Sequence, residues 1–383
     1  MRAERLRIAV WSVLAQLAGG CSGGNSIAPV PPVPACVPLS TPEFAYVLNG
    51  TSVSMYTVNS CTGELTPTTP ATVATGATPQ QIPAESMVVD PAGKFVYVAN
   101  LVSNATDAAT ISMYTVSAGT GVLNPTNPAA IHTGFFPQGI GIHPSGKFVY
   151  TANSDENTVS MFAVDSDTGL LVPTTPTTVA SGWSPLSVTV HPSGKFAYVA
   201  NQDDDTVSMY TVDSTTGVLT PMAPATVPTG ISPFGLTIDP SGKFAYVPDA
   251  YDSRNVLSQY TIDLDTGVLT PDNPATVTSG NQPTAVTVDP SGKFAYVTNR
   301  LDNSISVFAI DSTTGNLAFK SIIQTGTQPY RITFDPSGKF VYVANEGSGV
   351  AIYALGADGS LASAGQALPG TASTVAVVIA PHH

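Results

Sequence analysis

The hydrophobic pattern of the chain is a short module that returns at nearly constant intervals. In the copy at residues 235–277, an alternating apolar stretch (235–239) is followed by a Pro-Ser-Gly-Lys turn and an apolar run (244–247). A third apolar run, 256–262, ends at an Asp-Leu-Asp-Thr-Gly hairpin sequence, after which a fourth stretch begins at residue 268. Alternation and turn chemistry of this kind predict four short strands in each module.

Two prolines, Pro271 and Pro274, interrupt the fourth stretch. Proline cannot donate a hydrogen bond to a neighbouring strand, so it is tolerated mainly at the edge of a sheet. The fourth strand is therefore predicted to be the outermost strand of its sheet.

The module occurs seven times along the chain. Self-similarity with a period of about 40 to 50 residues and several strands per repeat is typical of a β-propeller, with one blade per repeat. We therefore predict an all-β fold, a seven-bladed propeller with four-stranded blades. The phenylalanine that opens the second strand of each module marks the copies: Phe44, Phe95, Phe148, Phe196, Phe244, Phe294 and Phe340.

The two ends of the repeat region indicate how the ring closes. The first module begins at its second strand, 44–47, whereas the chain ends with an isolated strand-like stretch, 374–379. We predict that this C-terminal strand completes blade one. We call the face that carries the turns after the first strand and the hairpins after the third strand the bottom, and the opposite face the top.

The first 21 residues have the features of an export signal. Three arginines precede an apolar run, 8–18, which is too short to span a bilayer, and small residues lead to Cys21. This arrangement resembles a bacterial lipoprotein signal, in which Cys21 would carry the lipid, although Leu17 lies four residues before the cysteine rather than three. We expect a lipid-anchored protein of the cell envelope, periplasmic or at the cell surface, with plain secretion as the alternative.

Residues 22–40 are rich in proline and are predicted to be a tether, followed by a single propeller domain, 41–383. Cys36 precedes the second strand of blade one, and Cys61 lies in the hairpin of the same blade, so both belong to the bottom face. Exported proteins tend to pair such cysteines. We predict a disulfide between them, with two unpaired thiols as the alternative.

The formal net charge of −13 limits the partners of the protein. Six of its 13 basic residues are the lysines of the repeated turn, so no clustered cationic surface remains for a phosphate backbone. We expect no nucleic-acid partner and no membrane contact except through the lipid anchor.

The end of the second strand carries a recognisable motif. The sequence Tyr-Val-Thr-Asn at 296–299, with Tyr-Val-Ala-Asn at 97–100, 198–201 and 342–345, resembles the YVTN-repeat propellers. More broadly, residues 42–381 resemble the lactonase family of seven-bladed propellers, which includes 6-phosphogluconolactonase-like members. The resemblance implies a hydrolase that opens a cyclic ester, but the matching residues are turn and core residues and indicate no catalytic group.

One position of the first strand departs from its repeat. Arg331 stands in a column of small residues, which places a cation near the top of the central channel, beside Tyr330. We interpret Arg331 as a catalytic residue that binds an anion or a carbonyl, with a structural ion pair as the alternative. The other members of this column are Ser86, Gly139, Ser187, Gly235, Ala285 and Ala376.

Further candidates surround Arg331. Tyr330 shares its column with Glu85, Gln138 and Phe234, and Arg300 is one of the few basic residues outside the repeat. We predict that Tyr330, Gln138, Phe234 and Arg300 bind a ligand. Glu85 is a candidate general base.

Histidines offer one more candidate base. His132 has no role in the repeat, so it is an alternative general base. His143 and His191 replace the aspartate of the repeated turn and are predicted to form turn hydrogen bonds.

Two enlarged loops on the top face, 77–85 and 101–110, lie around blade two and are our preferred binding region, with tolerated surface variation as the alternative.

The acidic run 203–205 could hold Ca²⁺, but a solvated loop is the simpler interpretation. No nucleophile elbow, zinc motif or phosphate loop is present in the sequence. We therefore predict no cofactor and no metal.

Two functions are compatible with these patterns. Because the sequence shows no catalytic constellation, we favour a binding module whose top face takes a small molecule, a glycan or a protein. The alternative is a lactone hydrolase in which Arg331 polarises the carbonyl and Glu85 or His132 activates water.

Overall fold

The computed structural model describes residues 36, 42–76, 86–101, 109–250, 255–365, 368 and 374–380. The chain divides into two units, Met1–Val37 and Pro38–His383, and every described strand belongs to the second unit. The predicted export signal with Cys21, nearly all of the tether, Glu85 and most of the two enlarged loops lie outside the described residues. Within the described part of the chain, no helix has the length and hydropathy of a membrane span.

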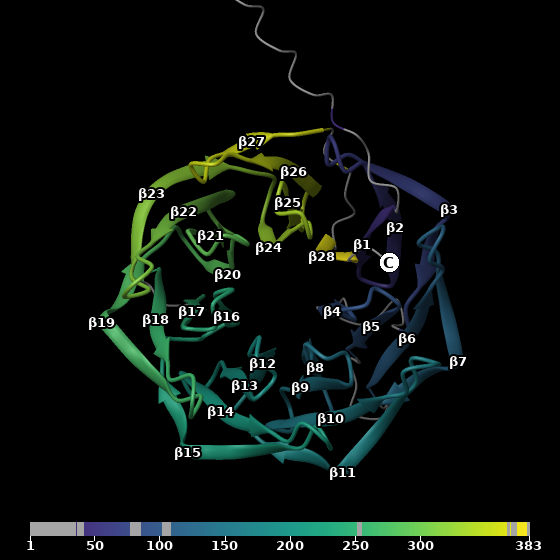
Figure 1. Ribbon diagram of the computed structural model, residues 1–383, viewed down its shortest axis with the longest axis horizontal. Helices are drawn as coiled ribbons and strands as arrows, with labels where there is room; N and C mark the ends of the chain where they lie inside the picture. The colour runs from purple at the N-terminus through teal and green to yellow at the C-terminus, as the bar shows by residue number, and fades with distance from the viewer. Residues whose placement is uncertain are drawn as a thin grey trace, which may run out of the picture. The chain divides into compact units, whose positions relative to one another are not determined.

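The second unit is a ring of seven four-stranded antiparallel sheets, which confirms the predicted propeller (Figure 1). The innermost strand of each blade lies nearest the ring axis. From blade one to blade seven, the innermost strands are β28 (Thr374–Ala380), β4 (Ser86–Val89), β8 (Pro137–Ile142), β12 (Pro185–Val190), β16 (Thr237–Ile238), β20 (Pro283–Val288) and β24 (Pro329–Phe334).

The second strand of each blade is its most buried strand, since it lies between other strands of the sheet and packs against both neighbouring blades. These strands are β1 (Glu43–Asn49), β5 (Phe95–Asn100), β9 (Phe148–Asn153), β13 (Phe196–Asn201), β17 (Phe244–Asp249), β21 (Phe294–Asn299) and β25 (Phe340–Asn345).

The third strands carry large side chains that fill the space between blades, most of them Met, Tyr or Phe. They are β2 (Ser52–Val58), β6 (Thr110–Val116), β10 (Thr158–Val164), β14 (Thr206–Val212), β18 (Val256–Ile262), β22 (Ser304–Ile310) and β26 (Gly349–Leu355).

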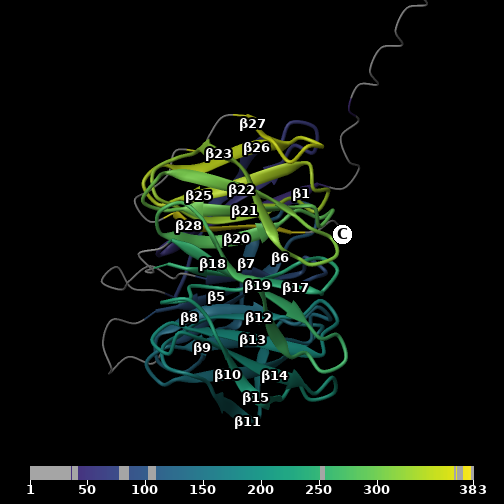
Figure 2. The same ribbon diagram turned by 90° about the vertical axis from the view of Figure 1, so that its left-hand side faces the viewer.

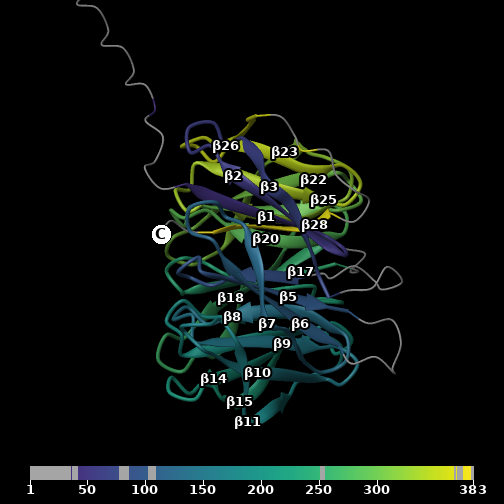
Figure 3. The ribbon, with the colours of Figure 1, turned by 90° about the vertical axis from the view of Figure 1, so that its right-hand side faces the viewer.

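The proline-containing strand is the outermost strand of its sheet, as predicted. Figure 2 looks onto the side of the ring that carries β19 and β23, and Figure 3 onto the side that carries β3 and β7. The outermost strands are β3 (Leu65–Ala74), β7 (Leu123–His132), β11 (Leu171–Ala180), β15 (Leu219–Pro228), β19 (Leu269–Thr278), β23 (Leu317–Gln324) and β27 (Leu361–Ser363).

The C-terminal strand closes the ring, as the sequence predicts. β28 pairs with β1 from Phe44 opposite Ala380 to Asn49 opposite Thr374. The hydroxyl of Thr374 donates a hydrogen bond to Asn49 Oδ1 over 2.8 Å. Blade one therefore combines the first and last strands of the propeller in one sheet (Figure 1).

Each blade is fastened to the next by the tyrosine of its second strand. In blade four, the hydroxyl of Tyr198 donates a hydrogen bond to the carbonyl oxygen of Gly267, in the hairpin of blade five, over 2.7 Å. Gly267 has a positive φ of 77°, and a Cβ placed on it would lie 2.4 Å from the ring of Phe196. Only glycine fits both the turn and the close approach of the ring.

The same contact recurs at all seven blade junctions. The last bond, from the hydroxyl of Tyr342 to the carbonyl oxygen of Gly63 (2.9 Å), joins blade seven to blade one. The other pairs are Tyr46 with Gly121, Tyr97 with Gly169, Tyr150 with Gly217, Tyr246 with Gly315 and Tyr296 with Gly359.

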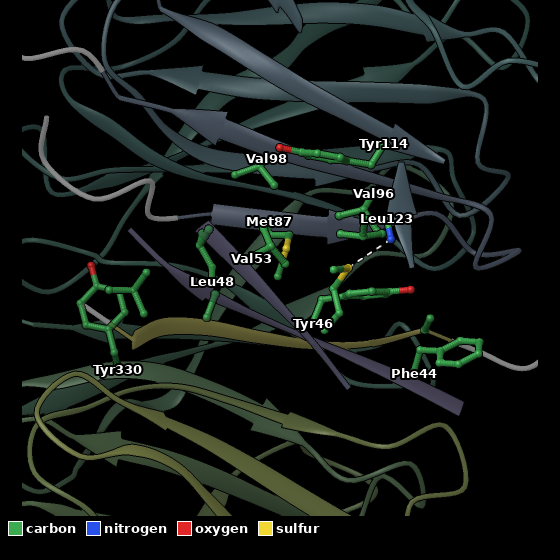
Figure 4. Close-up of a cluster of buried hydrophobic side chains, with 14 residues drawn as sticks. Phe44, Tyr46, Leu48, Val53, Met87, Val96, Val98, Tyr114, Leu123 and Tyr330 are labelled. Carbon is green, nitrogen blue, oxygen red and sulfur yellow. Dashed lines mark hydrogen bonds between the residues drawn. The ribbon is translucent and has the colours of Figure 1, made fainter. Parts of the chain in front are cut away.

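A sulfur atom forms a second contact between blades. Met55 Sδ, in blade one, accepts a hydrogen bond from the backbone N–H of Leu123 in blade two over 3.1 Å, within the apolar cluster of Figure 4. In blade five Gln259 replaces the methionine, and its Oε1 accepts the equivalent bond from Leu317 over 2.7 Å. The sequence alone does not reveal this acceptor role of the methionines.

The repeated turn has the predicted hydrogen bonds. Asp239 Oδ1 accepts the backbone N–H of Phe244 over 2.8 Å. Where histidine replaces the aspartate, His143 Nδ1 accepts the N–H of Ser145 (3.0 Å) and Nε2 lies 2.9 Å from the carbonyl oxygen of Gly194 in the next blade. These contacts confirm the structural role predicted for the turn histidines.

Cys36 and Cys61 are each disulfide-bonded in the structure, which is the state that the predicted bridge requires.

The tyrosine bonds between blades can be tested by removing one hydroxyl. We expect Tyr198→Phe to lower the free energy of unfolding by about 1 to 2 kcal/mol, because the buried carbonyl of Gly267 loses its partner. Urea denaturation measures the change. Tyr56→Phe is the control, since the Tyr56 hydroxyl bonds none of the described residues; an equal loss in both variants would contradict the assignment.

The closure of the ring can be tested by shortening the chain. Removal of residues 374–383 deletes β28 and leaves the inner edge of β1 unpaired, so we expect loss of the cooperative thermal transition followed by circular dichroism. Removal of 381–383 alone keeps β28 and should leave the midpoint nearly unchanged. A normal transition after the longer deletion would show that β28 does not close the ring.

Burial of the seven junction tyrosines predicts alkaline unfolding. Burial raises the pKa of each of these hydroxyls above the ordinary value of 10, so the folded state retains protons that the unfolded chain loses. The contribution of these tyrosines to the free energy of unfolding should be fully present below pH 10 and should fall as the pH rises above that value. Tyrosinate absorbance near 295 nm should rise together with loss of the β-sheet signal; ionisation of all tyrosines before unfolding would contradict this.

Candidate functional site: a cavity on the ring axis

The innermost strands enclose a cavity of about 250 Å³. All seven blades contribute to its wall through the residue column that contains Arg331, so the column identified in the sequence lines the cavity. The wall is formed mainly by small and β-branched side chains together with several hydroxyl groups, including those of Ser86, Ser187, Thr189, Thr237 and Thr284.

Arg331 is the only charged side chain among the described residues of the cavity wall. It lies on β24, is partly exposed, and its guanidinium carbon is 6.0 Å from the centre of the Tyr330 ring. No carboxylate of the described residues forms an ion pair with it. The wall therefore presents one positive charge, which suits a carbonyl oxygen or a single negative charge.

Tyr330 directly precedes Arg331 on β24, and its ring packs against that of Phe234. Their rings form an edge-to-face pair with centroids 5.6 Å apart, and Tyr330 is only 8% exposed. Tyr330 also belongs to the apolar cluster that spans blades one and two (Figure 4). The fold therefore brings the two rings together as an aromatic pair.

Gln138 lies on β8, directly before the cavity residue Gly139. Its Oε1 atom is buried and has no hydrogen-bond partner among the described residues. Its position is therefore close to the cavity wall, although Gln138 is not one of the residues that line it.

Arg300 is held away from the cavity. It follows β21 on the top face, where its guanidinium forms an ion pair with Glu346 over 2.6 Å. Glu346 follows β25, so the pair joins the loops of blades six and seven. Arg300 is absent from the cavity wall that the described residues form.

His132 is also separated from Arg331. It is the last residue of β7, the outermost strand of blade two, and its side chain is exposed. Two strands, β5 and β6, lie between β7 and the innermost strand β4. Of the two candidate bases, His132 does not reach the cavity, and Glu85, directly before Ser86 of the wall, lies outside the described residues.

The acidic run of the top face serves its own loops. Asp204 Oδ2 accepts the backbone N–H of Trp183 (2.7 Å), and Asp205 Oδ1 accepts that of Ser232 (2.8 Å). Within the described residues, no group of three or more metal-binding side chains comes together. Asp204 and Asp205 therefore order the neighbouring loops of the top face.

The family model described as "Lactonase, 7-bladed beta-propeller" matches residues 39–184 and 187–378. No curated protein matches the chain significantly. A putative 6-phosphogluconolactonase from Bacteroides fragilis has a similar solved structure, with a TM-score of 0.73 at 20% identity, covering 89% of this chain and 98% of that protein.

Two further solved structures show the same similarity. A putative 6-phosphogluconolactonase from Bacteroides uniformis has a TM-score of 0.73 at 21% identity, covering 88% of this chain and 99% of its own. The periplasmic gluconolactonase PpgL of Pseudomonas aeruginosa has a TM-score of 0.69 at 20% identity, covering 89% and 99%. At these identities the solved structures establish the shared fold.

The family match overturns the binding-module interpretation. That interpretation relied on the absence of a catalytic motif, whereas the matched family is a family of lactonases and the match covers nearly the whole propeller. Opening of a lactone needs an electrophilic group and a water molecule rather than a nucleophile motif, so the absence of such a motif was weak evidence.

Proposed function

The chain belongs to the lactonase family of seven-bladed β-propellers, and from that premise we propose that it is a lactone hydrolase whose substrate binds in the axial cavity. The observation that carries the proposal is the position of Arg331, the one charged side chain that the described residues place in the cavity wall. The names of the similar solved structures support the same reaction class.

Arg331 supplies the electrophilic group. Its guanidinium donates a hydrogen bond to the carbonyl oxygen of the lactone and stabilises the negative charge that this oxygen gains when water attacks. The carbonyl-to-ring-oxygen bond then breaks, and the ring oxygen takes a proton. The product is an open hydroxy acid whose carboxylate remains beside the guanidinium.

Glu85 is the group that we propose removes the proton from the attacking water. It directly precedes Ser86, which lines the cavity, and a carboxylate is a common general base. His132 is not proposed for this step, because it lies on the outermost strand.

The size and charge of the cavity support an unphosphorylated lactone as the substrate. Phosphate recognition usually relies on several charge-assisted hydrogen bonds, whereas the described wall offers one guanidinium. A cavity of about 250 Å³ suits a small monocyclic molecule rather than a large ligand.

The proposal predicts that Arg331→Ala lowers kcat/KM for lactone hydrolysis about a hundredfold, the scale of losing one donor to a developing oxyanion. Proton release from glucono-δ-lactone and δ-valerolactone, corrected for spontaneous hydrolysis, measures it. Arg300→Ala is the matched control and should retain turnover, because Arg300 lies outside the cavity wall.

Arg331→Lys keeps the positive charge and is the conservative variant. Circular dichroism of each variant checks that a loss of turnover is not caused by misfolding. Unchanged turnover in Arg331→Ala would show that Arg331 is not the electrophilic group. If the wild-type protein hydrolyses neither neutral nor phosphorylated lactones, the proposed function is wrong.

A further inference from the structure

The hydroxyl groups of the cavity wall differ in whether they form hydrogen bonds with other protein groups. The hydroxyls of Thr189 and Thr237 donate to backbone carbonyl oxygens of the next blade over 2.7 and 2.6 Å, and Ser86 Oγ accepts a backbone N–H over 3.2 Å. Ser187 is different. It is 8% exposed, and its Oγ atom is buried without a hydrogen-bond partner among the described residues.

An unpaired buried hydroxyl is costly. Leaving a buried donor or acceptor unsatisfied costs about 1 to 3 kcal/mol, so native proteins rarely keep one without a use. Alanine fits the same column at Ala285 and Ala376, where no hydroxyl is present. The fold itself therefore does not require a hydroxyl at position 187.

The two glycines beside Ser187 have different surroundings. A Cβ on Gly139, in blade three, would lie 2.5 Å from the carbonyl oxygen of Leu186 and 2.6 Å from the Cα of Ser187, so this glycine is needed for close backbone packing. A Cβ on Gly235, in blade five, would meet only Ser187 Oγ, at 4.0 Å. The wall is therefore open at Gly235, directly beside the unused hydroxyl.

Ser187 and Arg331 lie on opposite sides of the ring axis. Ser187 belongs to β12 and Arg331 to β24, and these innermost strands face each other across the centre of Figure 1. Both residues line the same cavity. A small ring whose carbonyl contacts Arg331 would therefore present its far side to Ser187 and the open wall at Gly235.

We propose that Ser187 is a specificity-determining residue that hydrogen-bonds a hydroxyl group of a hydroxylated lactone seated against Gly235, while Arg331 holds the lactone carbonyl. The inference rests on the proposed function for its reaction. No hydrogen bond to a described residue holds the Ser187 hydroxyl in its present rotamer, so turning it towards the cavity breaks none. A lactone without hydroxyl groups cannot use this contact.

The test compares two lactones with one variant. Glucono-δ-lactone carries ring hydroxyls and δ-valerolactone carries none. Loss of one neutral hydrogen bond changes an equilibrium by about fivefold. We therefore expect Ser187→Ala to lower the ratio of kcat/KM for glucono-δ-lactone to that for δ-valerolactone about fivefold. Gly235→Ala should lower the same ratio, because its methyl group fills the open wall; an unchanged ratio in both variants overturns the proposal.

A stability measurement separates specificity from folding. Ser187→Ala removes no hydrogen bond to a described residue, so its thermal midpoint should equal or exceed that of the wild type. Ser208→Ala is the matched control. Ser208 is buried outside the cavity, and Asn201 Nδ2 donates to its Oγ over 2.9 Å, so this variant should melt at a lower temperature. Strong destabilisation by Ser187→Ala would assign the hydroxyl to the fold and overturn the proposal.

A binding measurement keeps the two proposals distinguishable. Gluconolactam and δ-valerolactam resemble the two lactones but resist hydrolysis, and calorimetry gives their affinities. If no lactone is hydrolysed but Ser187→Ala weakens gluconolactam about fivefold and δ-valerolactam less, the hydrolase proposal fails and the Ser187 contact stands. If lactones are hydrolysed but Ser187→Ala changes neither the ratio of the two kcat/KM values nor the ratio of the two lactam affinities, the hydrolase proposal stands and the Ser187 contact is overturned.

Discussion

The structure depends on one repeated contact, the bond from a second-strand tyrosine to the hairpin glycine of the next blade. The signature phenylalanine two residues earlier packs on the same glycine, so one hairpin receives a ring and a hydroxyl from its neighbour. Buried hydrogen bonds of this kind are strong because no water competes for the carbonyl. Seven such contacts connect each blade to the next in a closed circuit that includes the junction of blade seven with blade one.

The axis-facing column of the innermost strands differs in side chain from blade to blade. It carries Ser, Gly, Ala or Arg, although close packing against the next blade requires glycine at Gly139. The cavity wall is thus the part of the repeat where side-chain identity varies while the backbone stays the same. Repeat folds commonly separate a conserved framework from a variable surface in this way.

The axial cavity changes the view of the site that the sequence suggests. Arg331 lines the cavity, Tyr330 and Phe234 form an edge-to-face pair, and Arg300 forms an ion pair with Glu346. The remaining polar group of interest is Ser187, which no motif marks. Under the proposed function, the one cation would polarise the ester carbonyl and the hydroxyls would orient the substrate.

The sequence by itself determined the number of blades, the strands in each blade and the closure by the C-terminal strand. These features depend on local alternation, turn residues and spacing, all of which are visible along the chain. It also indicated that Arg331 places a positive charge near the central channel, because a charged residue stands out in a column of small ones. Only the tertiary structure showed that the side chains of His132 and Arg300 lie away from the cavity and that the Ser187 side chain lines it. Repeat alignment shows which residues are equivalent. The distance of a side chain from the axis and the presence of a bonding partner depend instead on packing between blades. The contacts that join blades link residues about 50 to 80 positions apart or, at the closing junction, nearly 280 positions apart.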